Sequence, residues 1–204
     1  MPLTPATSRA FSLLELMVVV AIIGLVVGLT VLGAGSRNAA SLRNSGALAG
    51  GVADSARQMA QSSRTKTALA VAISGQDEYR ALTVLKLETN GQWTPAARWT
   101  RLPDGIIFDN NVPAVSGVSD FFTNTPSITN TIRMAGATLA DGTGFRAQCF
   151  SQDGSLEGQT APVRLRLREG FSANGIQTST AGNTNRYFDI YLIPTGGRVK
   201  YVQP

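Results

Sequence analysis

The amino-acid sequence predicts an α+β protein in which a long N-terminal helix packs on a mostly antiparallel β-sheet head. Three observations predict this fold. A segment near the N-terminus carries no charged residue from Leu16 to Ser36, and helical periodicity continues after it to about Ser63. The remainder consists of short strand-like runs separated by turn residues. We therefore expect a helix over residues 11–63 and one β-rich globular head over residues 64–204.

The uncharged segment is long enough to cross a membrane. As a helix rising about 1.5 Å per residue it measures about 30 Å, the thickness of the hydrocarbon core of a bilayer. We expect a transmembrane helix at about residues 14–36. Glu15 lies at its entrance, and burying an ionised carboxylate on such a helix costs roughly 2.5–3.5 kcal/mol on insertion scales. An acid in this place predicts a functional site with a cationic partner.

Cleavage of the chain between Ala10 and Phe11 would supply that cation. The new ammonium group on Phe11 would lie one helical turn from Glu15, because residues four apart share one face of a helix. It could pair with Glu15 of the same chain or with Glu15 of a neighbouring copy. We therefore assign Ala10 and Phe11 to processing, and Phe11 and Glu15 to assembly.

This arrangement resembles the signature of type IV pilins and pseudopilins. In that signature a short polar leader precedes Phe, and Glu is the fifth residue of the apolar helix that follows. The resemblance implies that a prepilin peptidase removes the leader, residues 1–10, and that Phe11 is N-methylated. Ala10 stands where members of the family usually have Gly. The alternatives are an ordinary secretory signal, whose apolar stretch is shorter, at roughly 7–15 residues, and a plain membrane anchor.

The helix carries two further patterns. Gly24 and Gly28 form a small-xxx-small pair, which lets helix backbones approach closely and predicts a helix-packing face. Glycines weaken the helix, and they predict a bend or local melting near Gly33 to Gly35 or near Gly50. Beyond the uncharged segment, apolar side chains recur at helical spacing, and we expect them to face the head: Leu48, Val52, Ala56 and Met59.

Strand-like runs dominate the rest of the chain. Asn90-Gly91 predicts a hairpin with a type I′ turn, and we expect long loops over residues 109–131 and 170–185, which are rich in Asn, Thr, Ser and Gly. The expected strands are Ala68–Ser74, Arg80–Glu88, Ile106–Phe108, Phe145–Ser151, Val163–Arg168, Tyr187–Ile193 and Arg198–Val202.

Several segments of the head resemble the GspH/FimT class of minor pseudopilins and minor pilins. The resemblance implies the pilin-like fold, with the long helix packed on a β head that could contain two small sheets. The segments that carry it are Ala68–Ser74, Leu102–Gly105, Phe150–Gly154 and Phe188–Lys200, the last ending in Gly197-Arg198-Val199-Lys200.

Basic residues alternate with apolar residues in one of the expected strands. Arg164, Arg166 and Arg168 would line one face of the strand and leave the apolar side chains between them to the core. With Arg198 and Lys200, which also alternate, this face could contact phosphates. Some minor pilins of the resembled class bind DNA through a basic C-terminal segment. The alternative is a solvated strand face without a ligand.

Composition argues against an enzyme. The chain has 204 residues, a net charge of +5, no histidine and one cysteine, so the commonest general base and metal ligand is absent. Cys149 is expected to be a small core residue. The acidic residues Asp77 and Glu78 lie in turn-like sequence, where carboxylates commonly cap or solvate. We expect no catalytic residues, no metal site, no cofactor and no small-molecule substrate.

The combined prediction is a minor pseudopilin of a type II secretion-like machine. It would be made as a single-pass precursor in the inner membrane with its head in the periplasm. A prepilin peptidase would process it, and other pilins or pseudopilins would be its filament partners. The leading alternative is a minor type IV pilin that binds DNA through Arg164, Arg166, Arg168, Arg198 and Lys200 during DNA uptake. A secreted enzyme would need a catalytic set that the sequence does not show.

Overall fold

The computed structural model describes residues 13–123, 128, 132–134, 137–139, 144–179 and 186–202, without the side chains of residues 24–38, 133–134 and 137–139. Two compact units make up the chain, residues 1–39 and residues 40–204. The expected leader, the cleavage site before Phe11 and the Phe11 amine lie outside the described residues.

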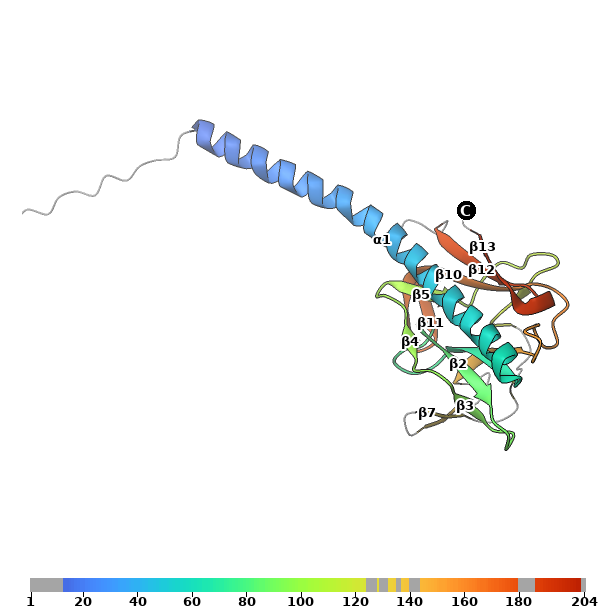
Figure 1. Cartoon of the computed structure of the whole chain (residues 1–204). Coiled ribbons are helices and arrows are strands. Elements are labelled where there is room, and N and C mark those ends of the chain that lie inside the picture. The colour runs from blue at the N-terminus through green and yellow to red at the C-terminus, as the bar shows by residue number, and fades with distance from the viewer. Residues whose placement is uncertain are drawn as a thin grey trace, which may run out of the picture. The chain divides into compact units, whose positions relative to one another are not determined.

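Helix α1 runs from Leu13 to Ser63 and contains 51 residues (Figure 1). In the first unit, its large apolar side chains between Leu13 and Ile23 are 47–77% exposed. Within the described part of the chain, no helix combines the length and the apolar character needed to cross a membrane. The side chains of the second half of the expected span, with Gly24 and Gly28, are outside the description.

The first sheet has the strand order β3-β2-β1-β9, and β4 also pairs with β2. Strand β1 lies at its centre, where Leu69 is opposite Val84 on one side and Gln148 on the other. All of its pairings are antiparallel. Its strands are β1 (Thr67–Ala72), β2 (Ala81–Leu87), β3 (Trp93–Pro95), β4 (Thr100–Arg101) and β9 (Phe145–Phe150).

The second sheet is built on the long strand β10 and has the order β11-β10-β12-β13, with β5 and β6 also paired to β10. The pair β6–β10 is parallel, and the other pairs described in this sheet are antiparallel. Its strands are β5 (Ile106–Asp109), β6 (Ser119–Asp120), β10 (Val163–Ala173), β11 (Ile176–Ser179), β12 (Tyr187–Leu192) and β13 (Val199–Val202). A two-stranded sheet, β7 (Ile132–Met134) with β8 (Ala137–Leu139), and a short 3-10 helix, η1 (Thr195–Gly197), complete the described elements. The predicted α+β class with a mostly antiparallel head is confirmed.

The predicted Asn90-Gly91 hairpin is present between β2 and β3, but its turn is of another type. Gly91 has a φ of 78° and Asn90 is not among the residues with positive φ. The Gly91 N–H donates to Glu88 O at 2.9 Å and the Glu88 N–H donates to Gln92 O at 2.8 Å. This is a three-residue loop with glycine in the left-handed position, in place of the two-residue type I′ turn.

A second Asn-Gly pair forms the type I′ turn that the sequence analysis placed elsewhere. Asn174 and Gly175, with φ values of 55° and 78°, join β10 to β11, and Ala173 pairs with Ile176 across the turn. The prediction of a loop from Gly170 onward is therefore wrong over residues 170–179. Ser, Thr and Gln on this hairpin hide the strand alternation, although the turn signal itself was present.

One hydrophobic core joins the second part of α1 to the inner faces of both large sheets. The helix contributes a row of mostly small side chains that are at most 6% exposed: Leu42, Ala49, Ala53, Ala56 and Ala60. Leu48, Val52 and Met59 flank this row and are only partly buried. The predicted stripe is thus correct at Ala56 and displaced to one flank elsewhere, because small side chains let the sheets approach the helix backbone.

Gly46 and Gly50 receive aromatic rings of the second sheet, and α1 is uninterrupted at both positions. A Cβ atom at Gly46 would lie 2.4 Å from the ring of Phe188, and one at Gly50 would lie 2.2 Å from Tyr201 Oη. The two rings contact each other edge to face, with centroids 5.9 Å apart. Local melting near Gly33 to Gly35 or Gly50 is therefore not observed, and Gly46 and Gly50 serve close packing.

A second core lies between the first sheet and the segment around Ile128 and Ile132. Cys149 is completely buried in it, together with Phe145 and Ala147. Its predicted role as a small core residue is confirmed.

Alanine substitutions along α1 should separate packing from helix propensity. In a helix interior Ala is about 1 kcal/mol more favourable than Gly, whereas overpacking costs about 1–3 kcal/mol. Gly46→Ala should therefore lower the free energy of unfolding, because Phe188 is buried. Gly50→Ala should lower it less, because Tyr201 is 46% exposed and can move.

Gly51→Ala is the matched control, because no atom lies within 4 Å of its Cβ position. It should raise stability by up to about 1 kcal/mol. Urea unfolding of the full chain in detergent measures all three variants. Equal effects at Gly46 and Gly51 would contradict the packing account.

Candidate functional site

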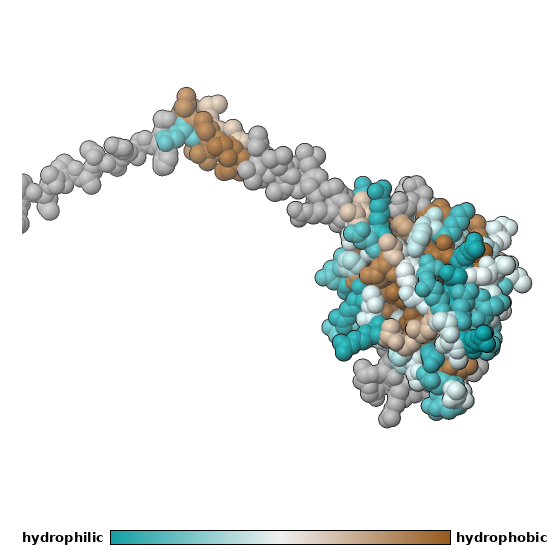
Figure 2. Space-filling model, in the orientation of Figure 1, coloured by the Kyte–Doolittle hydropathy of each residue, from teal (hydrophilic) through white to brown (hydrophobic). Residues whose placement is uncertain are grey.

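Glu15 lies in the first turn of α1 and is exposed. A carboxylate in the first turn of a helix is favoured by the positive end of the helix dipole. Exposed apolar side chains surround it, and Figure 2 shows them in brown around the start of the described helix. The first unit thus presents one acid within an apolar surface, as the sequence predicted.

Strand β10 alternates as predicted, with Val163, Leu165 and Leu167 buried in the main core. The three arginines between them, at 164, 166 and 168, lie on the opposite face of the second sheet. The partners of each guanidinium group determine whether this face can bind an anion.

Arg164 is 3% exposed. Its Nη2 donates a hydrogen bond to the carbonyl oxygen of Pro113 at 2.6 Å. Asp120 lies opposite Arg164 in the parallel pairing and accepts a hydrogen bond from the Phe122 N–H at 2.9 Å. Burial raises the pKa of the Asp120 carboxyl, although the Phe122 N–H and the Arg164 charge act against this shift. Arg164 is therefore part of the interior.

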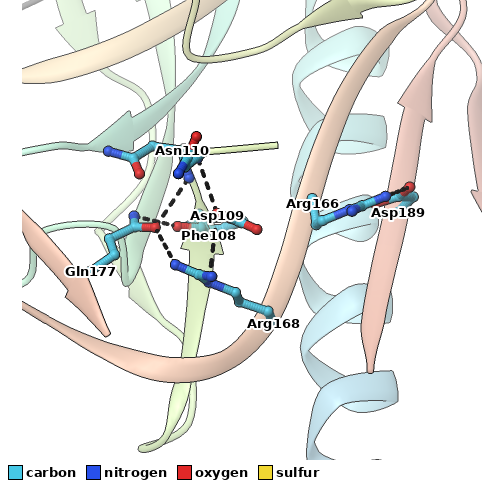
Figure 3. A network of polar contacts seen from close by, with 8 residues as sticks. Phe108, Asp109, Asn110, Arg166, Arg168, Gln177 and Asp189 are labelled. Atoms are coloured by element: carbon cyan, nitrogen blue, oxygen red, sulfur yellow. Dashed lines mark hydrogen bonds and ion pairs between the residues drawn. The ribbon is translucent and has the colours of Figure 1, made fainter. Parts of the chain in front are cut away.

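Arg166 forms a two-pronged ion pair with Asp189 on β12 (Figure 3). Its Nε donates to Oδ1 at 2.6 Å and its Nη2 donates to Oδ2 at 2.7 Å, while its guanidinium carbon lies 3.5 Å from the ring centroid of Tyr187. The exposed fractions of the two side chains are 12% and 3%. Burial alone would lower the pKa of Arg166, but the hydrogen bonds and charge of Asp189 outweigh it and raise the pKa.

Arg168 belongs to a network with β5 and β11 (Figure 3). Its Nη2 donates to Gln177 Oε1 at 3.2 Å, and its Nε lies 3.5 Å from Asp109 Oδ1. The Gln177 amide also pairs with the backbone of β5: its Nε2 donates to Phe108 O at 2.8 Å, and its Oε1 accepts from Asn110 N–H at 3.2 Å. Arg168 is thus held from two sides.

The five basic residues of the predicted phosphate-contacting face therefore separate into two sets. The alternation of Arg164, Arg166 and Arg168 is as predicted, but their expected exposure is wrong, because each is held by hydrogen bonds or ion pairs to neighbouring elements of the head. Arg198 and Lys200 are exposed. Lys200 lies opposite Tyr191, which in turn lies opposite Arg164, so the strands do bring the two sets to one face.

Glu78 is a structural residue that sequence reasoning assigned to a solvated turn. It is 6% exposed, and its carboxylate accepts hydrogen bonds from Ser172 Oγ at 2.8 Å and from the Gly175 N–H at 3.0 Å. Glu78 thereby ties the turn between β1 and β2 to the β10–β11 hairpin. Its neighbour Asp77 pairs with the more exposed Arg101 at 2.6 Å. The Asn-Gly turn was the one signal that could have located this contact.

The described residues contain no group of three or more His, Cys, Asp or Glu side chains placed to hold a metal ion.

The N-terminal segment of the chain matches a known family model. Residues 6–31 match the family model described as the prokaryotic N-terminal methylation motif. The start of the chain therefore carries an N-terminal methylation motif. The match spans the residues of the predicted cleavage site and Glu15, so the predicted N-terminal methylation motif is confirmed.

Solved structures similar to this chain include the minor pseudopilin EpsH from the Type 2 Secretion System of Vibrio cholerae. It is 12% identical, and the match covers 80% of this chain and 98% of that chain with a TM-score of 0.46. The type IV minor pilin FimU of Pseudomonas aeruginosa is 13% identical, with 80% and 88% of the two chains covered and a TM-score of 0.42. A comparison with curated proteins gives no match.

Removal of Asp189 should strongly destabilise the head, because it leaves the Arg166 guanidinium without its partner in a mostly buried place. Breaking such a pair from one side costs about 3–5 kcal/mol. Asp189→Ala should approach this loss, measured by urea unfolding of the full chain in detergent.

Asp104→Ala is the control for this prediction. It removes a carboxylate that also pairs with an arginine, Arg80, but is 98% exposed, so the loss should stay within about 1 kcal/mol. Replacing both buried partners, with Arg166→Met and Asp189→Leu, should cost less than Asp189→Ala alone. A loss at Asp189 no larger than that at Asp104 would contradict the account.

Proposed function

We propose that the chain is a minor pseudopilin, a structural subunit of a type II secretion-like pseudopilus. It would be anchored in the inner membrane by its N-terminal helix, with the head in the periplasm, and it would act by assembly and contact without catalysis. The observation that carries the proposal is the methylation motif over residues 6–31. The motif includes Glu15 and the start of the apolar helix, from which the same function was predicted.

Processing supplies the charge that assembly needs. A prepilin peptidase cuts before Phe11 and releases residues 1–10, which leaves an ammonium group on Phe11 that the family methylates. As a subunit leaves the bilayer, its Glu15 pairs with the Phe11 amine of a neighbouring subunit. Where water is scarce, such an attraction is stronger than in bulk water, and the single pair also fixes the register between two otherwise uniform apolar helices.

The exposed apolar side chains of the first unit support this proposal. Residues from Leu13 to Ile23 present a surface with no apolar partner among the described residues. Lipid before assembly, and neighbouring helices after it, are surroundings in which such side chains leave water. The second part of α1 is built into the head core, so a subunit that is moved by its helix carries its head with it.

The alternative function, DNA binding through five basic residues, has less support. Arg164, Arg166 and Arg168 are committed to partners within the head, which leaves only Arg198 and Lys200 exposed. We do not propose it for the whole set.

Intact-mass measurement and N-terminal sequencing of the mature protein test the proposed class. We expect a chain that begins at Phe11 and carries one additional methyl group. Ala10→Gly restores the residue usual in the family at this position and should leave the product unchanged. A mature protein that retains Met1, or begins beyond Glu15, would rule out the proposed assembly.

Loss of the Glu15 charge should block assembly without blocking insertion. Glu15→Ala and Glu15→Gln should both remain in the membrane fraction and be processed, while their recovery in sheared filaments falls on the order of tenfold or more, the effect of losing about 1.4 kcal/mol of pairing. Met17→Ala, which truncates a nearby side chain without changing charge, is the control. Full incorporation of Glu15→Gln would contradict the pairing.

A further inference from the structure

Strand β13 is the outer strand on one side of the second sheet, and some of its backbone groups have no hydrogen-bond partner within the described part of the chain. The Ile193 N–H donates to Arg198 O at 2.9 Å, so the backbone of Arg198 faces β12. Because backbone groups alternate in direction along an antiparallel strand, those of Val199 and Tyr201 face away from β12. No hydrogen bond among the described residues takes up these outward groups.

The outer edge of β5, which lies on the other side of β10, is closed. On β5 the outward N–H of Phe108 donates to Tyr79 O at 2.8 Å, and the outward carbonyl of Phe108 accepts from Gln177 Nε2 at 2.8 Å. Gln177 also takes up the N–H of Asn110. The head thus satisfies these backbone groups at the β5 edge, whereas no described residue takes up those of Val199 and Tyr201 on β13.

The open edge is fixed in place before any partner arrives. Arg198 already has extended backbone angles, and β13 is paired with β12 over four residues. From its inner face, the Tyr201 ring contacts Gly50 of α1 and the ring of Phe188. Binding of a strand there orders little of the head, which lowers the entropic cost of association.

The charge at this edge selects the partner. Arg198 and Lys200 are exposed, and no ion pair among the described residues engages either of them. Two copies of β13 paired edge to edge would bring like charges together, which is a common device against self-association. A strand with acidic side chains meets attraction in place of this repulsion.

We propose that the outer edge of β13 binds an extended, acidic segment of a neighbouring filament subunit of different sequence by strand addition. Main-chain hydrogen bonds to Val199 and Tyr201 hold the segment, and Arg198 and Lys200 select its charge. That the partner is a filament subunit rests on the proposed function, whereas the binding edge does not.

The test measures fluorescence anisotropy of labelled peptides with the full chain in detergent. The probe is a seven-residue peptide in which Glu alternates with Val. A second peptide replaces each Glu with Lys, and a third keeps the acidic sequence but has N-methylated backbone amides at alternate residues. The acidic peptide should bind, and the affinities of the other two peptides should be lower by about tenfold or more.

Charge reversal gives the matched variants. Arg198→Glu with Lys200→Glu should weaken binding of the acidic peptide and create binding of the basic one. Arg64→Glu with Arg98→Glu, which makes the same change of charge at two other exposed positions, should leave both unchanged. Circular dichroism of the variants shows whether the head is intact.

Three results would overturn the proposal. The acidic peptide could fail to bind, it could bind equally well with N-methylated amides, which indicates charge attraction alone, or a short DNA duplex could displace it and bind more tightly, which assigns the basic residues to nucleic acid. If a chain that is not processed at Phe11 binds the peptide, the binding edge is supported and the filament partner is ruled out. If a processed chain does not bind the peptide, the proposed function stands and the binding edge is ruled out.

Discussion

The head depends on how closely two sheets can approach one helix. Between residues 40 and 63, α1 faces the core mainly with alanine and glycine, so its own backbone forms much of the packing surface. The buried ring of Phe188 lies where a side chain at Gly46 would be, and the core then takes its bulk from the sheets, in residues such as Phe108 and Leu167. Such an interface has little spare volume, because protein interiors are packed as densely as organic crystals.

On the outer face of β10, charged side chains connect the strands of the head to one another. Each of the three arginines on this strand has acceptors on a different neighbouring element. Arg164 contacts the backbone of Pro113, Arg166 contacts β12, and Arg168 contacts β5 and β11. The free energy gained from such pairs is limited by desolvation. Their geometry is specific, however, and a slip of β10 by one residue would move every guanidinium away from its acceptors.

Patterns local to the chain could be read from the sequence, and features that depend on distant partners could not. The strand periodicity, the acid at the start of the apolar helix and the end of α1 at Ser63 follow from residues within a few positions of one another. The burial of Arg164 depends on the carbonyl of Pro113, 51 residues away, and Arg166 depends on Asp189, 23 residues away. The buried row of small residues on α1 was not predicted, because hydrophobic periodicity gives weight to Leu, Val and Met. The closest approach of the sheets to the helix requires Ala and Gly instead.

Gln177 makes the β5 edge of the second sheet different from its β13 edge. Its amide occupies the edge of β5 as a further strand would, with one donor and one acceptor set against the backbone of Phe108 and Asn110. A strand that adds to this sheet beside β5 would have to displace Gln177, whereas one that adds beside β13 meets backbone groups that no other described residue occupies. An array built through β13 would therefore join unlike surfaces, because the β5 edge of the next head is not available to receive it.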